Sequence, residues 1–593
     1  MVKVISAVGK HKQVYTDIHF GSFQWSPDGQ HLVYIAEQNP PKVLSFFEKE
    51  ESGKIEPGSK FELQESWGEA FAESLKPRIF LVNVETEDIW EAKGIPDHYS
   101  TGQVQWSPDG KGVVFVGWNT APQQEPTKSK LHNLKLKKKL GIIYCTNRDS
   151  ALYYLAIDET KGTNTSNNIV KLTSVARARS PRFTPDGKKI VFLSPLDDMD
   201  THSGPSRLFV LDWETKQSKL ITDIVSSPKT PQFPGIFTDI LPRSCFIDPS
   251  KVVLHSSYYS SSALLCISLE NGNVEVLLQN GAQVLDASPS GKLLISHSLS
   301  NQLPSIKIGR VEKDKIEWRT VDGSSKMLPV SSKIEELALQ VFPLTIPDVP
   351  HPIEYFLISP PNTSKSSGLI LFPHGGPHTC SDTNFFPLRA FFGLLNYHVL
   401  VVNYRGSNGF GLDALNSLLG HIGEHDVNDC VDALTDVLKK FPDIDKDKIF
   451  YYGGSHGGFM GCHLASKEKR IRAIALYNPV TNIASMTSTT DIPDWCYTEC
   501  DVFEYSASAV QKMFSLSPVS ALENIRTPIL FVLGEKDLRV PPHQGIHLHQ
   551  LLKERGIPTR LLIYPGEGHA IEKPEHLADV WINTILWFQQ HAQ

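Results

Sequence analysis

The residues Ile449-Phe450-Tyr451-Tyr452-Gly453-Gly454-Ser455-His456-Gly457-Gly458 decide the fold of the second half of the chain. They contain the pattern Gly-x-Ser-x-Gly, directly after an apolar run typical of a buried strand and directly before residues 456–466, which we expect to be helical. A serine at a tight strand-to-helix turn projects its hydroxyl from the edge of a sheet, and small neighbours permit the strained backbone. The pattern therefore predicts that Ser455 is a nucleophile.

Around this turn, apolar strands alternate with amphipathic helices from about residue 340 onward. Residues 426–438, for example, place apolar side chains at a helical spacing. The predicted strands are residues 368–372, 398–402, 449–452, 473–476, 529–533 and 560–564. Strands separated by helices favour a mostly parallel, doubly wound sheet with helices on both faces. We expect an α/β-hydrolase domain over residues 326–593.

Two loops downstream supply the partners that a serine nucleophile needs. A serine hydroxyl is a weak nucleophile without a base. Asp537 follows the predicted strand 529–533, and His569 follows the predicted strand 560–564. The order Ser, Asp, His is that of the α/β-hydrolase triad, whose members lie at the carboxyl ends of strands. We therefore expect a catalytic triad of Ser455, Asp537 and His569.

Other acids and histidines in this region are alternatives for the same roles. Glu535 lies two residues before Asp537, but Asp537 is at the end of its loop and is the better candidate. The further histidines, which we interpret as surface or half-buried helix residues, are His543, His547, His549 and His576.

A tetrahedral intermediate also needs hydrogen-bond donors for its oxyanion. Residues 374–377, His-Gly-Gly-Pro, follow the predicted strand 368–372, where this fold carries a glycine loop. The residue after the nucleophile supplies the second backbone N–H in such sites. The oxyanion donors are thus expected in the loop with the paired glycines 375 and 376 and at the N–H of His456.

The first half of the chain repeats a short pattern. Ser26-Pro27-Asp28-Gly29, Ser107-Pro108-Asp109-Gly110 and Thr184-Pro185-Asp186-Gly187 each precede an apolar run, as tight hairpin turns do. A second turn follows in each unit, and in the last three it lies at residues 160, 215 and 271, which gives steps of 55 and 56 residues. Repetition at this period favours a β-propeller over a tandem array of sandwiches. We expect about five visible blades over residues 1–325.

Composition narrows the classes of function. The formal net charge is −7, which gives no general reason to bind nucleic acid. The lysine-rich segment 126–140 is interpreted as a solvated loop. The sequence contains neither an apolar run long enough to cross a membrane nor a recognisable secretory signal. Eight cysteines without a Cys-x-x-Cys pair indicate neither a disulfide framework nor a zinc ribbon. We expect a cytoplasmic protein without a metal site.

The motifs together resemble the prolyl oligopeptidase family of serine peptidases. The resemblance is carried by residues 374–377, residues 403–411 (Asn-Tyr-Arg-Gly-Ser-Asn-Gly-Phe-Gly), residues 453–458 and residues 537–541 (Asp-Leu-Arg-Val-Pro). His456, residues 491–496 (Asp-Ile-Pro-Asp-Trp-Cys) and residues 65–69 (Glu-Ser-Trp-Gly-Glu) are most similar to the acylaminoacyl peptidase branch.

This resemblance implies a β-propeller that covers an α/β-hydrolase, with the active site between them. It implies a serine exopeptidase that works through an acyl-enzyme and releases an N-acylated, typically N-acetylated, amino acid from short blocked peptides. Members of this branch use no cofactor, are cytoplasmic and are often homo-oligomers. Carried over by position, the triad is Ser455, Asp537 and His569, the oxyanion donors are the N–H groups of Gly376 and His456, and Arg539 lies near bound substrate.

The chain departs from the family in two places. Relatives begin with a further stretch before the first repeat seen here, so the propeller could be incomplete. The lysine-rich segment 126–140 resembles an insertion. The alternatives are therefore a prolyl or dipeptidyl peptidase, a carboxylesterase on the same scaffold, or a catalytically weak scaffold. A dipeptidyl peptidase needs an acidic pair for a free amine; Glu50 and Glu51 are adjacent acids, which we interpret as solvated.

Overall fold

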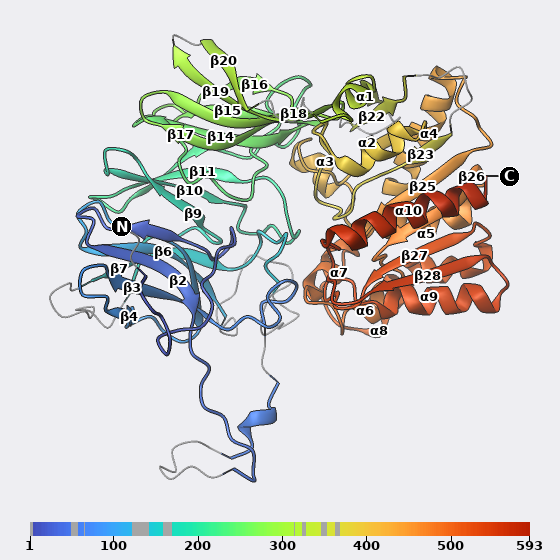
Figure 1. Ribbon diagram of the computed structural model, residues 1–593. Coiled ribbons are helices and arrows are strands. Elements are labelled where there is room, and N and C mark those ends of the chain that lie inside the picture. The colour runs from blue at the N-terminus through green and yellow to red at the C-terminus, as the bar shows by residue number, and fades with distance from the viewer. Residues whose placement is uncertain are drawn as a thin grey trace.

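The computed structural model describes residues 4–48, 57–63, 66–120, 141–157, 169–312, 315–322, 328–345, 353–361 and 368–592. The lysine-rich segment 126–140 and the acidic pair Glu50 and Glu51 lie outside these ranges. Figure 1 shows the two halves of the chain as two lobes side by side, with the amino-terminal strands in one and the helices of the carboxyl-terminal half in the other.

The amino-terminal half contains five four-stranded antiparallel sheets, each formed by four strands that follow one another in the sequence. The first sheet comprises β1 (Phe23–Trp25), β2 (His31–Glu37), β3 (Pro77–Asn83) and β4 (Ile89–Glu91). The second comprises β5 (Tyr99–Trp106), β6 (Gly112–Asn119), β7 (Ser150–Ala156) and β8 (Val170–Lys171). The third comprises β9 (Arg179–Phe183), β10 (Lys189–Ser194), β11 (Arg207–Asp212) and β12 (Ser218–Thr222). The fourth comprises β13 (Phe246–Asp248), β14 (Lys251–Tyr258), β15 (Ser261–Ser268) and β16 (Val274–Gln279). The fifth comprises β17 (Ala282–Ser288), β18 (Lys292–Leu299), β19 (Gln302–Glu312) and β20 (Lys315–Asp322).

The repeated Ser/Thr-Pro-Asp-Gly turns join the first two strands of the first three sheets. In the second sheet, Ser107 Oγ donates to Asp109 Oδ1 at 2.6 Å and accepts from the N–H of Gly112 at 3.1 Å. Thr184 makes the equivalent bond to Asp186, also at 2.6 Å. The closing glycine has a positive φ of about 70°, for example 70° at Gly110, which is why glycine occupies this position.

Consecutive sheets pack against one another through shared apolar clusters. The first three sheets share one cluster, the third and fourth share a second, and the fourth and fifth share a third. The sheets therefore follow one another in series, as Figure 1 shows from the blue strands to the light-green ones, and they are not closed into a barrel.

The carboxyl-terminal half is built on one eight-stranded sheet in the order β21-β22-β24-β23-β25-β26-β27-β28. β22 is antiparallel to both of its neighbours, β21 and β24. The strands β23 to β28 run parallel to one another, which confirms the prediction of a mostly parallel sheet. The strands are β21 (Ala338–Leu344), β22 (Ile353–Ser359), β23 (Leu369–Leu371), β24 (His398–Asn403), β25 (Ile449–Gly454), β26 (Ile471–Tyr477), β27 (Ile529–Gly534) and β28 (Thr559–Tyr564).

Helices cover both faces of this sheet. One apolar cluster joins α4 (His425–Lys440), α5 (His456–Lys467) and α9 (His543–Glu554) to side chains such as Leu369 and Leu371. The other joins α1 (Ser331–Glu335), α2 (Pro387–Leu394) and α10 (Pro574–Gln590) to side chains such as Ile370. Successive residues of a strand face opposite sides, so the continuous apolar runs in the sequence serve both clusters. The shorter helices are α3 (Leu412–Asn416), α6 (Ile483–Met486), α7 (Pro493–Glu499), α8 (Ala507–Leu516), η1 (Ser59–Phe61) and η4 (Pro518–Asn524).

Buried polar contacts join the two halves. Arg148 of the amino-terminal half and Asp494 of α7 form an ion pair at 2.7 Å, and both side chains are buried. Asn403 at the end of β24 donates to the hydroxyl of Ser260 at 2.9 Å. Burying an ion pair demands good geometry, so these contacts fix the relative position of the halves. Among the helices in the described ranges, none is both long and apolar enough to cross a membrane.

Candidate active site

Ser455 occupies a strained turn between β25 and α5. Its backbone has φ 57° and ψ −121°, a conformation that is costly for a residue with a Cβ atom. The turn is held by its own sheet, because the N–H of Ser455 donates to the carbonyl of Tyr477 on β26 at 2.8 Å. A Cβ atom on Gly453 would lie 2.7 Å from the Gly457 carbonyl oxygen, so glycine is needed there. This is the local structure that the Gly-x-Ser-x-Gly pattern predicts.

Asp537 and His569 meet at the carboxyl ends of β27 and β28. The Nδ1 atom of His569 lies 2.7 Å from Oδ2 of Asp537, which is buried and whose Oδ1 also accepts from the N–H of Val540 at 2.8 Å. A carboxylate can only accept, so Nδ1 carries the proton and Nε2 keeps its lone pair. An imidazole held in this tautomer is suited to take a proton from a hydroxyl.

The alternative acids and histidines have other partners. Glu535 accepts a hydrogen bond from the N–H of Gly566 at 2.9 Å. His576 pairs with Glu567 at 2.5 Å, and His549 bonds the hydroxyl of Thr559 at 3.0 Å. His543 and His547 lie on α9 with His549. None of these contacts, within the described ranges, joins an alternative residue to Ser455.

Ser455 and His569 line one cavity of about 250 Å³. The carboxyl-terminal half contributes a mainly apolar set of lining residues: Gly375, Gly376, His378, Thr379, Val480, Met486, Ile492, Trp495, Arg539 and Val540. The amino-terminal half contributes a polar set: Tyr144, His202, Ser203 and Asp239. The cavity is thus formed by both halves of the chain.

The His-Gly-Gly-Pro loop lies against the serine turn. A Cβ atom on Gly375 would be 3.2 Å from the Cβ atom of Ser455, so the two backbones approach closely. Gly376 has φ 112° and lines the cavity, and its carbonyl accepts from the indole N–H of Trp495 at 3.1 Å. Here glycine is required both for the positive φ and for the close approach.

His374 is buried, and its side-chain contacts hold this loop in place. Its Nε2 atom lies 2.7 Å from the hydroxyl of Ser407, and its ring stacks on Tyr404 with centroids 4.4 Å apart. Burial lowers the pKa of His374 to about 3, although its hydrogen bond to the Gly375 carbonyl favours the protonated form. The imidazole is therefore neutral near pH 7, so the side chain that holds this loop carries no charge.

His456 begins α5 and its side chain points into the protein. Its Nε2 atom lies 2.7 Å from Oδ2 of Asp426, and both side chains are fully buried. The other oxygen of Asp426 accepts from the N–H groups of Gly423 and Val427 at 2.7 and 2.8 Å. The imidazole of His456 thus has a structural role. The group of this residue that is available to the site is its backbone N–H.

Arg539 lines the cavity, but its charge is already paired. Its Nε atom lies 2.7 Å from Oδ1 of Asp491, and its Nη2 atom donates to the carbonyl of Ile143 at 2.8 Å. The carboxylate of Asp491 raises the pKa of Arg539 above its ordinary value despite burial. Arg539 therefore lines the cavity with Asp491 as its counter-ion, and its contact with substrate stays a prediction.

Glu69 is a residue of the site that sequence reasoning missed. It comes from the amino-terminal half and is buried, and its carboxylate accepts from the N–H of Leu538 at 2.9 Å and from the N–H of His569 at 2.7 Å. Its own N–H donates to Asp491 at 2.9 Å. One carboxylate thus holds both loops that carry Asp537 and His569. Glu69 lies in a stretch that carries the family resemblance, but nothing local indicates partners 469 and 500 residues away.

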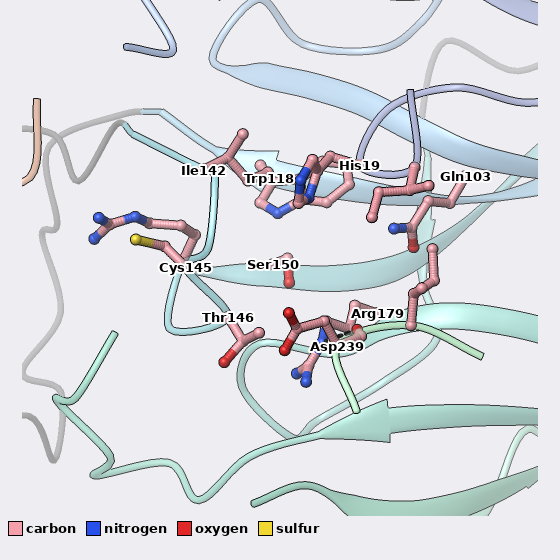
Figure 2. A pocket seen from close by; sticks show the side chains of 12 residues that line it. His19, Gln103, Trp118, Ile142, Cys145, Thr146, Ser150, Arg179 and Asp239 are labelled. Atoms are coloured by element: carbon pink, nitrogen blue, oxygen red, sulfur yellow. Dashed lines mark hydrogen bonds between the residues drawn. The ribbon is translucent and has the colours of Figure 1, made fainter. Parts of the chain in front are cut away.

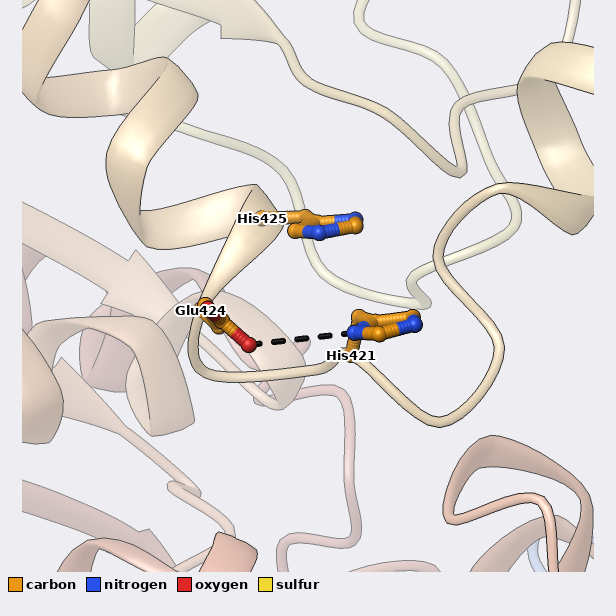
Figure 3. A group of neighbouring side chains, drawn as sticks. All are labelled: His421, Glu424 and His425. Atoms are coloured by element: carbon orange, nitrogen blue, oxygen red, sulfur yellow. Dashed lines mark ion pairs between the residues drawn. The ribbon is translucent and has the colours of Figure 1, made fainter.

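One group of side chains has the composition of a metal site. His421, Glu424 and His425 lie within 4.8 Å of one another between α3 and the start of α4, and the first two are exposed. Figure 3 shows the two imidazole rings stacked, and their planes differ by only 4° with centroids 4.3 Å apart. A metal binds in the plane of an imidazole through the nitrogen lone pair. Two parallel, stacked rings therefore cannot share an ion without turning, and we assign no metal role to this group.

Comparisons with known proteins identify the family of the chain. Two family models match the chain: "Acylamino-acid-releasing enzyme, N-terminal domain" over residues 3–335 and "Prolyl oligopeptidase family" over residues 384–593. The acylamino-acid-releasing enzyme of Mus musculus is 34% identical over 624 residues, covering 99% of this chain and 81% of the mouse protein.

Solved structures share the fold. The Pyrococcus horikoshii acylaminoacyl peptidase superposes with a TM-score of 0.72 at 16% identity, over 98% of this chain and 82% of that chain. An acylaminoacyl peptidase in complex with Z-Gly-Gly-Phe-chloromethyl ketone gives a TM-score of 0.72 at 17% identity, over 98% of this chain and 83% of that chain.

The fold and the family models define the protein as a serine hydrolase built on an α/β-hydrolase domain. Both the model for the amino-terminal domain, which matches more than half of the chain, and the mouse relative, which is matched over most of its length, specify the family. The chain belongs to the acylamino-acid-releasing enzymes of the prolyl oligopeptidase family. The resemblance that the motifs indicate is thereby confirmed.

Proposed function

We propose that this protein is a serine exopeptidase that releases an N-acylated, typically N-acetylated, amino acid from the amino terminus of short blocked peptides. The observation that carries the proposal is the single cavity lined by Ser455 and His569, with Asp537 hydrogen-bonded to the far side of the imidazole. The mouse relative is named for the release of acylamino acids, which supports the substrate class. A related acylaminoacyl peptidase forms a complex with the peptide-like Z-Gly-Gly-Phe-chloromethyl ketone, which supports a peptide substrate.

In the first step, Ser455 Oγ attacks the carbonyl carbon of the acylated residue and His569 Nε2 takes the hydroxyl proton. Asp537 holds the Nδ1 proton and stabilises the imidazolium that forms. The negative charge moves to the carbonyl oxygen, which the N–H groups of Gly376 and His456 would stabilise. Such donors each contribute about 3 to 4 kcal/mol to the transition state in serine peptidases.

In the second step, the tetrahedral intermediate collapses and the peptide bond breaks. His569 gives its proton to the departing amine, and the acylated residue stays on Ser455 as an ester. A water then attacks this ester, with His569 again as the base, and releases the N-acyl amino acid. Every proton in this cycle passes through one imidazole, so its position decides the rate.

The lining of the cavity suits an uncharged amino end of the substrate. Val480, Met486, Ile492, Trp495 and Val540 surround the site with apolar surface from the carboxyl-terminal half. An acyl cap removes the positive charge of the terminal amine, so it can enter this surface without an acidic partner. Arg539 lies near this part of the cavity and would help to orient the peptide through its pair with Asp491.

The wider organisation of the protein is also part of the proposal. We infer that the five four-stranded sheets are blades of a β-propeller, which their meander order and serial packing support. The propeller domain would comprise residues 1–325 and the hydrolase domain residues 326–593. All eight cysteines are free thiols, which supports a reducing, cytoplasmic compartment. We further propose that the enzyme is a homo-oligomer.

A substrate panel tests the proposed function. Chromogenic acetyl-alanyl, free alanyl, glycyl-prolyl and simple ester substrates are compared by kcat/KM. We expect the acetyl-alanyl substrate to give the highest value. Preference for the free dipeptide over the acetylated residue would overturn the proposal in favour of a dipeptidyl peptidase. No turnover of any member would identify a scaffold without catalytic power.

A further inference from the structure

The catalytic cavity contains one acidic side chain that no step of the proposed mechanism uses. Asp239 lies in the connection between β12 and β13, it is exposed, and it lines the same cavity as Ser455 and His569. It also lines a smaller cavity of about 30 Å³ within the amino-terminal half. Figure 2 shows Asp239 beside Arg179, across this smaller cavity from His19 and Trp118. Asp239 therefore stands where the two cavities meet.

The other ionisable side chains of the catalytic cavity are paired or neutral. Arg539 has Asp491 at 2.7 Å, and His569 has Asp537 at 2.7 Å. His378 lies 3.1 Å from Glu499, which raises its pKa. Burial lowers the pKa of His202, so that imidazole is neutral near pH 7. Within the described part of the chain, the Asp239 carboxylate has neither an ion pair within 4 Å nor a hydrogen bond.

The loop that carries Asp239 is held firmly by buried arginines. Arg179 donates from Nε to the carbonyl of Asp239 at 2.8 Å, and Arg182 donates to the carbonyls of Leu241 and Pro242 at 2.6 and 2.7 Å. Burial lowers the pKa of each of these two arginines to about 10. Both guanidinium groups bond backbone oxygens. The charge of Arg179 also attracts the Asp239 carboxylate, as His19 does when protonated, but neither makes a direct ion pair or hydrogen bond with it. The carboxylate oxygens of this fixed loop are therefore placed to receive a cation from the cavity side.

We propose that Asp239 is a specificity-determining residue that selects peptides with a cationic side chain, Lys or Arg, on the leaving side of the scissile bond. The inference rests on the proposed function. The acyl cap carries no charge, and the apolar surface around Trp495 favours an uncharged side chain in the released residue. A positive charge in the substrate can therefore come from the leaving peptide, and Asp239 is the acidic side chain of this cavity that has no direct ion pair among the described residues.

Two matched peptides test this inference. Acetyl-Ala-Ala-Lys-amide and acetyl-Ala-Ala-norleucine-amide differ by a charge on a side chain of similar length, and the terminal amide removes the carboxylate. We expect wild-type kcat/KM to favour the Lys peptide by about three- to tenfold, because a partly exposed ion pair contributes modestly. The preference should shrink as ionic strength rises. In Asp239→Asn the ratio of the kcat/KM values for the two peptides should fall to about one.

Two further variants sharpen the result. Asp239→Lys should reverse the preference toward acetyl-Ala-Ala-Glu-amide, because the side chain is exposed and its charge can change without refolding the loop. Asp286→Asn removes an exposed carboxylate from β17, outside the cavity, and should keep the wild-type ratio. An equal loss in Asp286→Asn would overturn the inference, because it would show a diffuse field.

The outcomes also separate this inference from the proposed function. If the wild type cleaves both acetylated peptides equally, the inference is wrong and the proposed function stands. If it cleaves neither, the proposed function is wrong as well. If Asp239→Asn loses turnover only of a free-amine peptide, Asp239 binds a terminal amine, and the inference about the leaving side is contradicted.

Discussion

The two sides of the active site are fixed by different parts of the molecule. The serine side is held by its own domain: Ser455 bonds Tyr477 on the neighbouring strand, and the His374 loop rests on Ser407. The acid–base side is held by a residue from the other half, because Glu69 bonds the backbones at Leu538 and His569. The serine turn is thus held within its own half, whereas the loop that carries His569 is bonded by Asn478 from its own half and by Glu69 from the other.

The strained serine turn and the loop that carries His569 are therefore held in place by different kinds of contact. A strained turn needs many nearby contacts to persist, and a glycine-rich strand-to-helix connection provides them in sequence. The loop that carries His569 follows the edge strand β28, and within its own half Asn478 donates to the His569 carbonyl at 3.0 Å. A buried carboxylate that accepts two N–H groups gives it a fixed position at the cost of desolvating one charge. Docking of the amino-terminal half therefore completes the site.

Substitution of Ser455, the proposed nucleophile, should have a larger effect on kcat than any other change on the two sides of the site. In Ser455→Ala we expect kcat for the acetyl-alanyl substrate to fall by about 10⁴-fold or more, as in other triad deletions. The unfolding temperature should stay close to that of the wild type, because the hydroxyl makes no structural bond among the described contacts. Steady-state kinetics and a thermal melt measure both quantities. Undiminished turnover would place the nucleophile elsewhere.

Substitution of Glu69 should impair the placement of His569 and leave the serine turn unchanged. In Glu69→Ala the N–H groups of Leu538 and His569 lose their shared acceptor, so the imidazole is less well placed. We expect kcat to fall about ten- to hundredfold with a smaller change in KM, because proton transfer by a positioned base contributes about 10² to 10⁴.

A neighbouring acid provides the control for this prediction. Glu73 is 91% exposed and lies 3.7 Å from Lys536, so it also joins the two halves but only at the surface. An exposed pair of this kind is worth less than about 1 kcal/mol. Glu73→Ala should change kcat by less than about twofold. If both variants lose activity equally, the effect belongs to docking in general and not to the bonds of Glu69.

The sequence points to the three residues of the proposed triad because each of them follows a strand. Ser455 comes directly after β25, and Asp537 and His569 lie in the loops that follow β27 and β28; the carboxyl ends of parallel strands meet at one edge of the sheet. Local pattern and topology together therefore place all three side chains. The serine turn was equally predictable, since glycines at 453, 457 and 458 are needed for its geometry.

The partners of the triad could not be predicted in this way. Glu69 and Asp426 act through contacts with segments far away in the sequence, and each looks locally like an ordinary solvated acid. Asp426, for example, occupies the first turn of α4, where acids are common, yet it is fully buried against His456. The antiparallel pair β21–β22 at the sheet edge was also missed, because its alternation is weak.

The smallest expected effect is on the free energy of unfolding, through its pH dependence at His374 on the serine side of the site. Burial lowers the pKa of His374 to about 3, whereas an unfolded histidine has a pKa of about 6.5. Below pH 6.5 the unfolded chain binds a proton that the folded chain excludes. The stability from the neutral imidazole is therefore complete above pH 6.5 and is lost as the pH falls toward 3. The slope for one such group is about 1.4 kcal/mol per pH unit.

His374→Gln should remove this part of the acid sensitivity. Between pH 7.0 and pH 5.5, the free energy of unfolding of the wild type should fall by about 1 kcal/mol more than that of the variant, measured by chemical denaturation. His421→Gln, which changes an exposed histidine, should keep the wild-type dependence. The comparison uses the change with pH and not the stability at one pH, because loss of the bond to Ser407 lowers the stability of the variant throughout. Parallel curves for wild type and His374→Gln would mean that the loop gains its support from Tyr404 and Trp495 and not from a neutral His374.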